Sequence, residues 1–433
     1  MNTNLSSNKK VYFIGIGGIG VSALTRKYLS DGYQVFGSDR SASKITKELE
    51  ILGVKIFLKQ KTTNITTDID LVIYTIAISG NHPELVRARK LGIKTLSYPE
   101  ALGELSKTLF TIAISGTHGK TTTTAMLAKI FVDAELDPTV IIGSNLLEQK
   151  SNFIAGKSKY FIVEACEYRR SFLNLSPQIL VITNIDNDHL DYYHDLAGIQ
   201  NAFSELASKI PSTGVLICDI HDSLLAPVIA TAHCQVIDYR QFDQIANQLS
   251  LKVPGVHNRL NAAAALAVGK LLRIPITISH TALQNFRGTW RRLEYLGCPR
   301  QGARLYDDYG HHPTEIKVTL DAIRCDFKPK RLIVIFQPHL YSRTKLLFKE
   351  FTESFNDADK ILVLPIYAAR EPRDPAISSR ILASAIPRAT YVSNIAAVER
   401  HLTTTDRRDI ILTLGAGDVF VVGEKLRYNQ RKI

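Results

Sequence analysis

The sequence has few of the features that mark membrane-spanning, secreted or cysteine-rich proteins. No apolar run among its 433 residues approaches the ~20 residues that a membrane-spanning helix needs. The five cysteines are odd in number and include no C-x-x-C pair, which argues against a disulfide framework and a zinc cluster. The opening segment, MNTNLSSNKK, lacks the apolar core of a secretory signal. We therefore expect a cytoplasmic protein in a reducing compartment, with no membrane as a partner.

The basic charge of the chain is not concentrated in any one segment. Lysine and arginine outnumber aspartate and glutamate by 53 to 41, which gives a net charge of +12. The densest basic runs are only pairs, such as Arg291-Arg292 and Arg407-Arg408. Proteins that bind nucleic acid usually gather such residues in a patch or stripe. We therefore expect no nucleic acid as a partner, and a phosphate-rich small substrate fits the basic balance better.

Short β-rich apolar runs alternate with helical patterns throughout the chain. This alternation is typical of α/β domains built on parallel sheets. Strand-like runs such as VYFIGIG (11–17) recur, and breaks fall near Ser106-Lys107 and within LGCPRQGA (296–303). The sequence therefore predicts three α/β domains, which are a Rossmann-like N-terminal domain (1–107), a P-loop-type central ATPase domain (108–297) and a Rossmann-like C-terminal domain (298–433).

A glycine-rich turn, GIGGIG (15–20), joins the first predicted strand to the first predicted helix. Gly15, Gly17 and Gly20 fit the G-x-G-x-x-G pattern, and Asp39 follows the second strand at about the spacing of a ribose-binding acid. In this pattern the exposed N–H groups of the helix N-terminus bind a diphosphate. The alternative is a turn needed only for close packing of helix on strand. With strand, helix and acid all in place, the pattern favours a bound diphosphate nucleotide.

A second phosphate-binding pattern, ISGTHGKTTTTAML (114–127), follows the apolar run TLFTIA and opens another helix. Gly119 lets the backbone approach a phosphate, Lys120 neutralises phosphate oxygens, and the Thr121 hydroxyl is a ligand for Mg²⁺. The strict P-loop pattern requires a glycine where this chain has Ile114, so the loop is a variant. A dehydrogenase needs only the first of the two nucleotide sites, and a simple ATPase needs only the second. The combination therefore points to neither.

Other polar residues follow further predicted strands. Glu164 and His189 stand at the ends of two buried strands, where carboxylate and imidazole can hold Mg²⁺ around triphosphate oxygens. In the C-terminal domain, DDYGHHPTE (307–315) and QPHLYSRT (337–344) lie at strand-to-helix turns. The second motif contains Arg343, whose planar fork matches the geometry of a carboxylate.

Taken together, these motifs resemble those of the Mur ligases. GIGGIG, GTHGKTTTT, VEACEYRRSFL, TNIDNDHLDYY, HNRLNAAAA, GTWRRLE, DDYGHHPTE and QPHLYSRT occur here in the order that the family shows. The resemblance runs from about Tyr12 to Gly423, and the last two motifs are those of the branch that joins L-alanine to UDP-N-acetylmuramate. Because the family carries a short G-T-x-G-K-T loop, the resemblance also accounts for Ile114.

The resemblance implies a role for each motif residue. The residues implied to bind the UDP part of the substrate are Gly15, Gly17, Gly18, Gly20 and Asp39. Those implied to bind ATP are Gly116, Thr117, His118, Gly119, Lys120, Thr121, Thr122, Asn258, Asn261 and Arg291 or Arg292, and those implied to bind Mg²⁺ are Thr121, Glu164 and His189. The implied amino-acid site consists of Tyr309, His339 and Arg343, and the implied catalytic residues are Lys120, Arg343 and His339, the last as a candidate base for the amine.

The resemblance also implies an activity, with ATP and Mg²⁺ as cofactors. The muramyl carboxylate would become an acyl phosphate, and L-alanine would displace the phosphate, in peptidoglycan precursor synthesis. Glycine and L-serine stay open as amines, and we expect a monomer or a weak homodimer. The rival interpretations are a recycling ligase that adds a preformed tripeptide and a non-catalytic nucleotide-binding protein on the same fold. An NAD-dependent dehydrogenase is suggested only by GIGGIG with Asp39.

Overall fold

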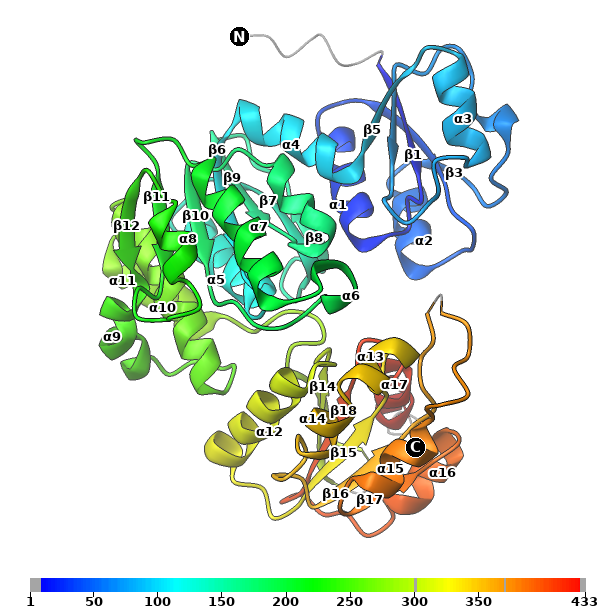
Figure 1. Ribbon diagram of the computed structural model, residues 1–433, viewed down its shortest axis with the longest axis vertical. Helices are drawn as coiled ribbons and strands as arrows, with labels where there is room; N and C mark the ends of the chain where they lie inside the picture. Colours follow the sequence, from blue (N-terminus) through cyan, green and yellow to red (C-terminus); the bar gives the residue numbers. More distant parts are fainter. Residues whose placement is uncertain (1–8, 300–301, 370, 429–433) are drawn as a thin grey trace. The chain divides into compact units, whose positions relative to one another are not determined.

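Three α/β domains follow one another along the chain (Figure 1). The computed structural model describes residues 9–299, 302–369 and 371–428, so most of the segment MNTNLSSNKK lies outside the described residues. Each domain is built on its own sheet of mainly parallel strands, which confirms the predicted fold class. Among the described helices, none is both long enough and apolar enough to span a membrane.

The N-terminal domain is a parallel sheet with helices on both faces, in the strand order β3-β2-β1-β4-β5. Its elements are β1 (Lys10–Ile14), α1 (Ile19–Ser30), β2 (Gln34–Ser38), α2 (Lys44–Ile51), β3 (Lys55–Phe57), η1 (Thr62–Asn64), β4 (Leu71–Tyr74), α3 (Pro83–Lys90), β5 (Lys94–Ser97) and α4 (Tyr98–Thr108). Alternate residues of β1 point to opposite faces of the sheet. Val11 and Phe13 pack in one apolar cluster with α1, whereas Tyr12 and Ile14 pack in another with α3.

The central domain has a seven-stranded sheet in the order β12-β11-β10-β6-β9-β7-β8. Its elements are β6 (Phe110–Ser115), α5 (Lys120–Asp133), β7 (Thr139–Leu146), β8 (Ser151–Ile154), β9 (Tyr160–Glu164), η2 (Tyr168–Asn174), β10 (Ile179–Ile182), α6 (Leu190–Tyr193), α7 (Leu196–Ser208), β11 (Val215–Cys218), α8 (Ala226–Ala230), β12 (Gln235–Asp238), η3 (Tyr239–Phe242), α9 (Asp243–Gln248), α10 (Val256–Leu271) and α11 (Ile276–Asn285). Only the edge strand β8 is antiparallel to its neighbour, and the sequence did not indicate this edge.

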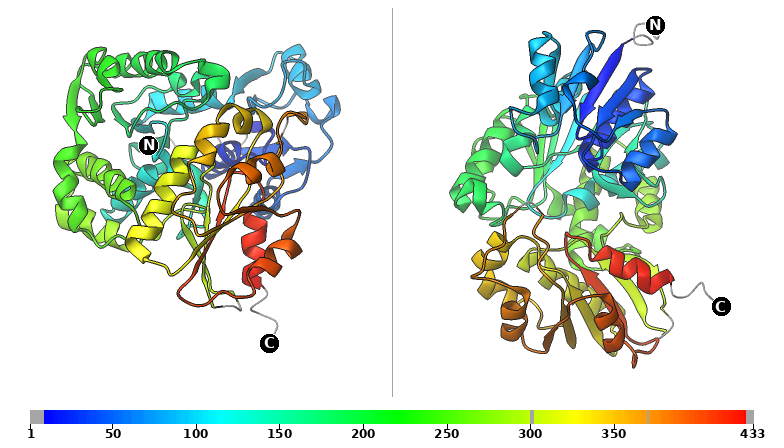
Figure 2. Two further views of the ribbon diagram at one scale, coloured as in Figure 1. Left: turned by 60° about the horizontal axis from the view of Figure 1, so that its bottom comes forward. Right: turned by 90° about the vertical axis from the view of Figure 1, so that its right-hand side faces the viewer.

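The C-terminal domain has a six-stranded sheet in the order β13-β14-β18-β15-β16-β17, with β13 antiparallel to β14. Its elements are β13 (Glu294–Gly297), β14 (Arg304–Asp308), α12 (Pro313–Phe327), β15 (Leu332–Phe336), α13 (Tyr341–Leu346), α14 (Phe348–Thr352), β16 (Lys360–Val363), α15 (Ser379–Ala385), β17 (Ala389–Tyr391), α16 (Ile395–His401), β18 (Ile410–Leu414) and α17 (Phe420–Tyr428). Leu332 and Val334 pack with α12 on one face, whereas Ile333 and Ile335 pack with α17 on the other. Figure 2 shows the ribbons of α12 (yellow) and α17 (red) on either side of this sheet.

The contacts divide the chain differently from the three sheets. Met1–Ser250 and Leu260–Phe286 form one compact unit, and Leu251–Arg259 and Arg287–Ile433 form a second. The first two domains share a unit because one apolar cluster runs from Leu102 of α4 through Phe172 to Phe203 of α7. The predicted boundary follows residue 297, which is the last residue of β13. Because β13 pairs with β14, the third sheet begins before that boundary.

The candidate site residues lie where parallel strands end. The glycine turn follows β1, the phosphate-loop motif follows β6, Glu164 is the last residue of β9, and His339 lies shortly after β15. In open α/β sheets, ligands bind at the carboxyl ends of the strands. The topology therefore gathers each predicted set of residues at the edge of a sheet where binding sites form.

The contact between α4 and η2 generates a prediction about stability. A Cβ added to Gly103 in α4 would lie 2.4 Å from the carbonyl oxygen of Asn174 in η2. We expect Gly103→Ala to lower the melting temperature, with a net destabilisation of about 1 kcal/mol or more, because overpacking outweighs the gain in helix propensity. Gly80→Ala is the control, since no heavy atom lies within 4 Å of its added Cβ. Equal melting temperatures for the two variants would contradict this packing.

Candidate functional site

The phosphate loop in the central domain requires glycine at two positions. Gly116 has φ +130° and Gly119, the N-cap of α5, has φ +84°. A Cβ at Gly116 would lie 2.1 Å from Thr183 Oγ1, and one at Gly119 would lie 2.4 Å from Asn261 Oδ1. Both the backbone conformation and the space exclude any side chain here. The loop therefore brings bare backbone to the N-terminus of α5, where N–H groups and the helix dipole favour an anion.

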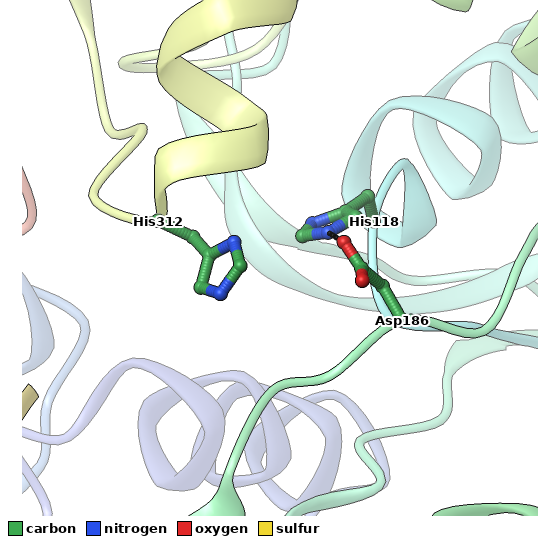
Figure 3. A group of neighbouring side chains, drawn as sticks. All are labelled: His118, Asp186 and His312. Atoms are coloured by element: carbon green, nitrogen blue, oxygen red, sulfur yellow. Dashed lines mark hydrogen bonds and ion pairs between the residues drawn. The ribbon is translucent and has the colours of Figure 1, made fainter. Parts of the chain in front are cut away.

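The segment after β10 holds the phosphate loop in place. The N–H of His118 donates to Asn184 Oδ1 at 2.9 Å, and His118 Nε2 lies 3.0 Å from Asp186 Oδ2 (Figure 3). In return, the N–H of Asp186 donates to Thr117 Oγ1 at 2.8 Å. The loop is therefore fixed by a neighbouring strand end as well as by its own glycines.

Lys120, the first residue of α5, folds back over the loop. Its Nζ donates to the carbonyl oxygens of Gly116 and Thr117 and, at 2.9 Å, to Glu167 Oε1. Burial by itself would lower the pKa of Lys120, but the negative charge of Glu167 and its neighbours outweighs burial, so the pKa is raised. The lysine therefore carries a positive charge at the loop.

Side-chain oxygens that can bind a metal ion lie beside the start of α5. Thr121 Oγ1 donates to Glu164 Oε1 at 3.0 Å, and the N–H of Gly143 donates to Glu164 Oε2 at 2.8 Å. His189 lies near Glu167, with Nε2 3.7 Å from Oε1 of that carboxylate. Hydroxyl and carboxylate oxygens are the ligands that Mg²⁺ prefers, and imidazole suits other divalent cations. The donor set therefore fits a divalent cation beside the phosphate loop.

The glycine turn of the N-terminal domain is held by the end of β2. The carbonyl oxygen of Ser38 accepts hydrogen bonds from the N–H groups of Gly15 and Ile16 at 2.8 and 3.0 Å. Asp39 Oδ2 accepts the N–H of Gly17 at 2.8 Å. The Asp39 carboxylate thus shapes the turn itself, which differs from the predicted contact with a ribose.

The next glycines of the turn differ in the space around them. A Cβ at Gly20 would lie 2.7 Å from the Tyr98 hydroxyl, whereas one at Gly18 would meet only ordinary contacts. Burial raises the pKa of Tyr98, and the charges of Cys166 and Glu164 add to this effect. The Tyr98 ring therefore occupies the space beside Gly20, which leaves no room for a side chain there.

In the C-terminal domain, His339 and Arg343 lie at the turn between β15 and α13. Arg343 Nη1 lies 3.2 Å from His339 Nδ1. The His339 ring stacks on Tyr367 with centroids 5.8 Å apart, and its other neighbour is the His311 ring at 5.6 Å. His311 in turn packs edge-on against Tyr309 at 5.3 Å. The predicted amino-acid residues therefore stand in one row of rings with an arginine at its side.

The environment of His339 argues against its predicted role as a base. Burial, with a further contribution from the Arg343 charge, lowers the pKa of His339 to about 4. Because a guanidinium only donates, Nδ1 must be the acceptor, which leaves the ring proton on Nε2. At neutral pH the ring is therefore an uncharged hydrogen-bond donor that orients Arg343.

The adjacent arginines 291 and 292 have different surroundings. The Arg291 side chain is only 2% exposed, and it donates from Nε to Asp307 Oδ2 at 2.7 Å and to backbone carbonyls within 415–417. The Arg292 side chain is 32% exposed and lies over the Tyr309 ring, 5.5 Å from its centroid. Of the two candidates for a phosphate contact, only Arg292 has solvent access.

Models of one family match most of the chain. The "Mur ligase family, catalytic domain" matches residues 10–109, the "Mur ligase middle domain" matches residues 114–245, and the "Mur ligase, glutamate ligase domain" matches residues 291–417. The chain belongs to the Mur ligase family. The predicted family membership is therefore confirmed.

Individual Mur ligases resemble the chain over nearly its whole length. The UDP-N-acetylmuramate–L-alanine ligase of Clostridium kluyveri is 43% identical, covering 98% of this chain and 99% of its own. The ligase of the same name from Clostridium novyi is 42% identical, covering 96% of this chain and 97% of its own. The crystal structure of UDP-N-acetylmuramate-alanine ligase from Thermotoga maritima has a TM-score of 0.81 at 27% identity, covering 98% of this chain and 100% of that chain.

This Mur ligase brings together many of the predicted residues of each site. In the central domain, Asn261 approaches Gly119, and Thr121 bonds to Glu164. Asn258 lies one turn earlier on α10, where its amide donates to a backbone carbonyl of the preceding loop at 2.6 Å. Arg291 lies in the interior of the C-terminal domain, where its guanidinium packs over the Tyr309 ring, 5.2 Å from the ring centroid.

Two residues at the sites of this Mur ligase were not singled out by the sequence. Glu167 lies within VEACEYRR, three residues after Glu164, and the motif itself was its only signal. Tyr98 begins α4 and carries no motif. Their positions beside Lys120 and Gly20 depend on how separate strands and helices pack, which spacing along the chain does not reveal.

The lowered pKa of His339 predicts a pH effect on stability. Between pH 6.5 and about 4 the unfolded chain binds a proton at this histidine and the folded protein does not, so stability falls as pH falls through this window. We expect His339→Gln to flatten that fall, measured as melting temperature against pH from 7 to 4. His221→Gln, whose side chain is 77% exposed, is the control. A slope for His339→Gln as steep as that of wild type would contradict the argument.

Proposed function

We propose that this Mur ligase joins L-alanine to the carboxylate of UDP-N-acetylmuramate, with conversion of ATP to ADP and phosphate. The observation that carries the proposal is the likeness to ligases of that name, at 43% identity over 98% of the chain. The phosphate loop of the central domain and the arginine-flanked row of rings in the C-terminal domain support it. Because both substrates that carry phosphate are intracellular nucleotides, we place the reaction in the cytoplasm.

In the N-terminal domain, the glycine turn would bind the diphosphate of the UDP group. Gly15, Gly17, Gly18 and Gly20 leave the start of α1 open to an anion, and its N–H groups and dipole favour negative charge. Asp39 would act indirectly, since its carboxylate holds the N–H of Gly17 and so fixes the turn.

In the central domain, the loop from Gly116 to Thr122 would bind the phosphates of ATP. Lys120 would offset the negative charge that develops as the phosphoryl group is transferred. Asn258 and Asn261 of α10 are assigned to the adenine side of the nucleotide. Thr121, Glu164 and His189 would hold Mg²⁺, which supplies a positive charge that polarises the transferred group.

In the C-terminal domain, Arg343 would bind the carboxylate of L-alanine through its planar fork. The row of rings from Tyr309 to Tyr367 supports this arginine through His339, and the neutral ring keeps its Nε2–H available as a donor. His339 is therefore assigned to positioning and hydrogen bonding rather than to removal of the amine proton.

The reaction needs each of these parts because a carboxylate does not acylate an amine in water. One carboxylate oxygen must first become a leaving group, and phosphoryl transfer to UDP-N-acetylmuramate supplies it as an acyl phosphate. The amine of L-alanine then attacks the acyl carbon, and phosphate leaves as the amide forms. Binding the amine beside the activated carboxyl raises its effective concentration.

Phosphate release from ATP is the experiment that tests this function. We expect release only when UDP-N-acetylmuramate and an amine are both present, and fastest with L-alanine rather than glycine, L-serine or a preformed tripeptide. Lys120→Ala should lower the rate by about 100-fold or more, since it removes a charge that stabilises the transition state. Lys129→Ala is the control on the same helix, because that side chain pairs with Asp133.

Each rival function gives a different result in the same assay. Phosphate release with UDP-N-acetylmuramate and the tripeptide, but with no single amino acid, would identify a recycling ligase. No phosphate release with any amine would identify a nucleotide-binding protein without activity. Competition between NADH and UDP-N-acetylmuramate would count against the assignment of the glycine turn.

The two adjacent arginines provide a second prediction. Arg291→Met should destabilise the protein by about 3–5 kcal/mol, because it leaves the buried Asp307 carboxylate without its partner. Arg292→Met should change stability by only about 0.5 kcal/mol, because this side chain is partly exposed. The same substitution should raise KM for ATP, because it removes the assigned phosphate contact. Thermal denaturation and steady-state kinetics of both variants separate the two roles. An unchanged KM in Arg292→Met would remove the assigned phosphate contact.

A further inference from the structure

Glu167 is a buried acid between the lysine of the phosphate loop and His189. Its side chain is only 4% exposed. Oε1 accepts a hydrogen bond from Lys120 Nζ at 2.9 Å and lies 3.7 Å from His189 Nε2. Oε2 is buried and has no hydrogen-bond partner among the described residues. One carboxylate thus touches the proposed nucleotide and metal sites and still has an unused buried oxygen.

While this ion pair persists, Lys120 has no N–H left for a phosphate. An ammonium group has three N–H donors, and those of Lys120 go to Gly116 O, Thr117 O and Glu167 Oε1. A phosphate oxygen can bind only if one of these contacts is given up. The two carbonyls belong to the loop itself, whereas Glu167 comes from the segment after β9. The contact with Glu167 can therefore break without any change in the loop.

The main chain of Glu167 is held firmly, so only its side chain can change partners. Its carbonyl oxygen accepts hydrogen bonds from the Tyr193 hydroxyl and from the N–H of Arg170. The next turn contains Arg169 and Arg170 with φ of +50° and +58°, an uncommon conformation that persists where the surroundings enforce it. The carboxylate therefore stays at the site whatever Lys120 does.

A carboxylate left buried without a cation is strongly unfavourable. If Lys120 turns to a phosphate, another positive charge must take its place beside Glu167. Carboxylate oxygens are preferred ligands of Mg²⁺, and His189 already lies beside the same Oε1. The divalent cation that accompanies the nucleotide satisfies this requirement.

We propose that Glu167 exchanges cations on nucleotide binding. Lys120 passes to the phosphates, and a divalent cation beside His189 takes its place on the Glu167 carboxylate. The exchange rests on the proposed ATP-dependent function and adds to it a residue that couples the metal to the lysine. A purely structural pair would stabilise the loop equally whether or not metal is present.

Calorimetric titration with ATP, in EDTA and in excess Mg²⁺, tests the exchange without measuring activity. Glu167→Gln removes the acid that competes for Lys120, so ATP should bind about fivefold more tightly than to wild type in EDTA. The same variant loses a metal contact, so the gain in affinity from Mg²⁺ should shrink about tenfold or more. Glu205→Gln is the control, because this exposed acid pairs with Arg170 near the same segment. Equal weakening under both conditions, or an unchanged gain from Mg²⁺, would overturn the proposal.

Titration with Mn²⁺ in the absence of nucleotide, followed by electron paramagnetic resonance, provides an independent measurement. Lys120→Met frees the Glu167 carboxylate, so Mn²⁺ should bind about tenfold more tightly than to wild type. Lys120→Met combined with Glu167→Gln removes both partners and should return the affinity to near that of wild type. No gain in the single variant, or the same gain in the double variant, would refute the exchange.

The two experiments also separate this proposal from the proposed function. Failure of wild type to bind ATP would remove the ATP-dependent function, whereas the Mn²⁺ titration uses no nucleotide. Should Lys120→Met fail to fold, Glu167→Gln in the calorimetric titration still decides the question.

Discussion

The close approach of backbone at the phosphate loop is the constraint on which the central domain depends. Gly116 and Gly119 adopt positive φ, and Thr183 and Asn261 fill the space where a Cβ would stand. This packing presents the start of α5 as bare backbone, with Lys120 folded over it. Thr183, directly after β10, and Asn261 of α10 therefore help to define the path of the loop together with its own glycines.

Charge at the loop is balanced by side chains that come from different strands. Lys120 meets Glu167 from the segment after β9, and Thr121 meets Glu164 at the end of that strand. A buried carboxylate such as that of Glu167 is strongly unfavourable without a cation, which accounts for its contact with Lys120. In the C-terminal domain, Arg343 is instead held by the neutral ring of His339, which stacks on the Tyr367 ring.

Local patterns were sufficient to predict the elements that carry the sites. The two glycine-containing motifs were each expected to open a helix, and helices α1 (Ile19–Ser30) and α5 (Lys120–Asp133) begin at those points. Both follow a buried strand through a glycine turn, a signal contained in a few consecutive residues. The antiparallel edges β8 and β13 were not predicted, because pairing at a sheet edge depends on residues far apart in the sequence.

The sequence by itself determined the three α/β domains, the two glycine turns and the family to which the chain belongs, since each is encoded by short motifs and periodicity. Only the tertiary structure decided which of the predicted side chains are exposed to a ligand and which are held by other residues. It placed Arg291 in the interior and left Arg292 partly exposed, turned Asp39 onto its own glycine turn, and set Glu167 against Lys120. These outcomes depend on burial and on partners contributed by distant segments, which a linear spacing does not specify.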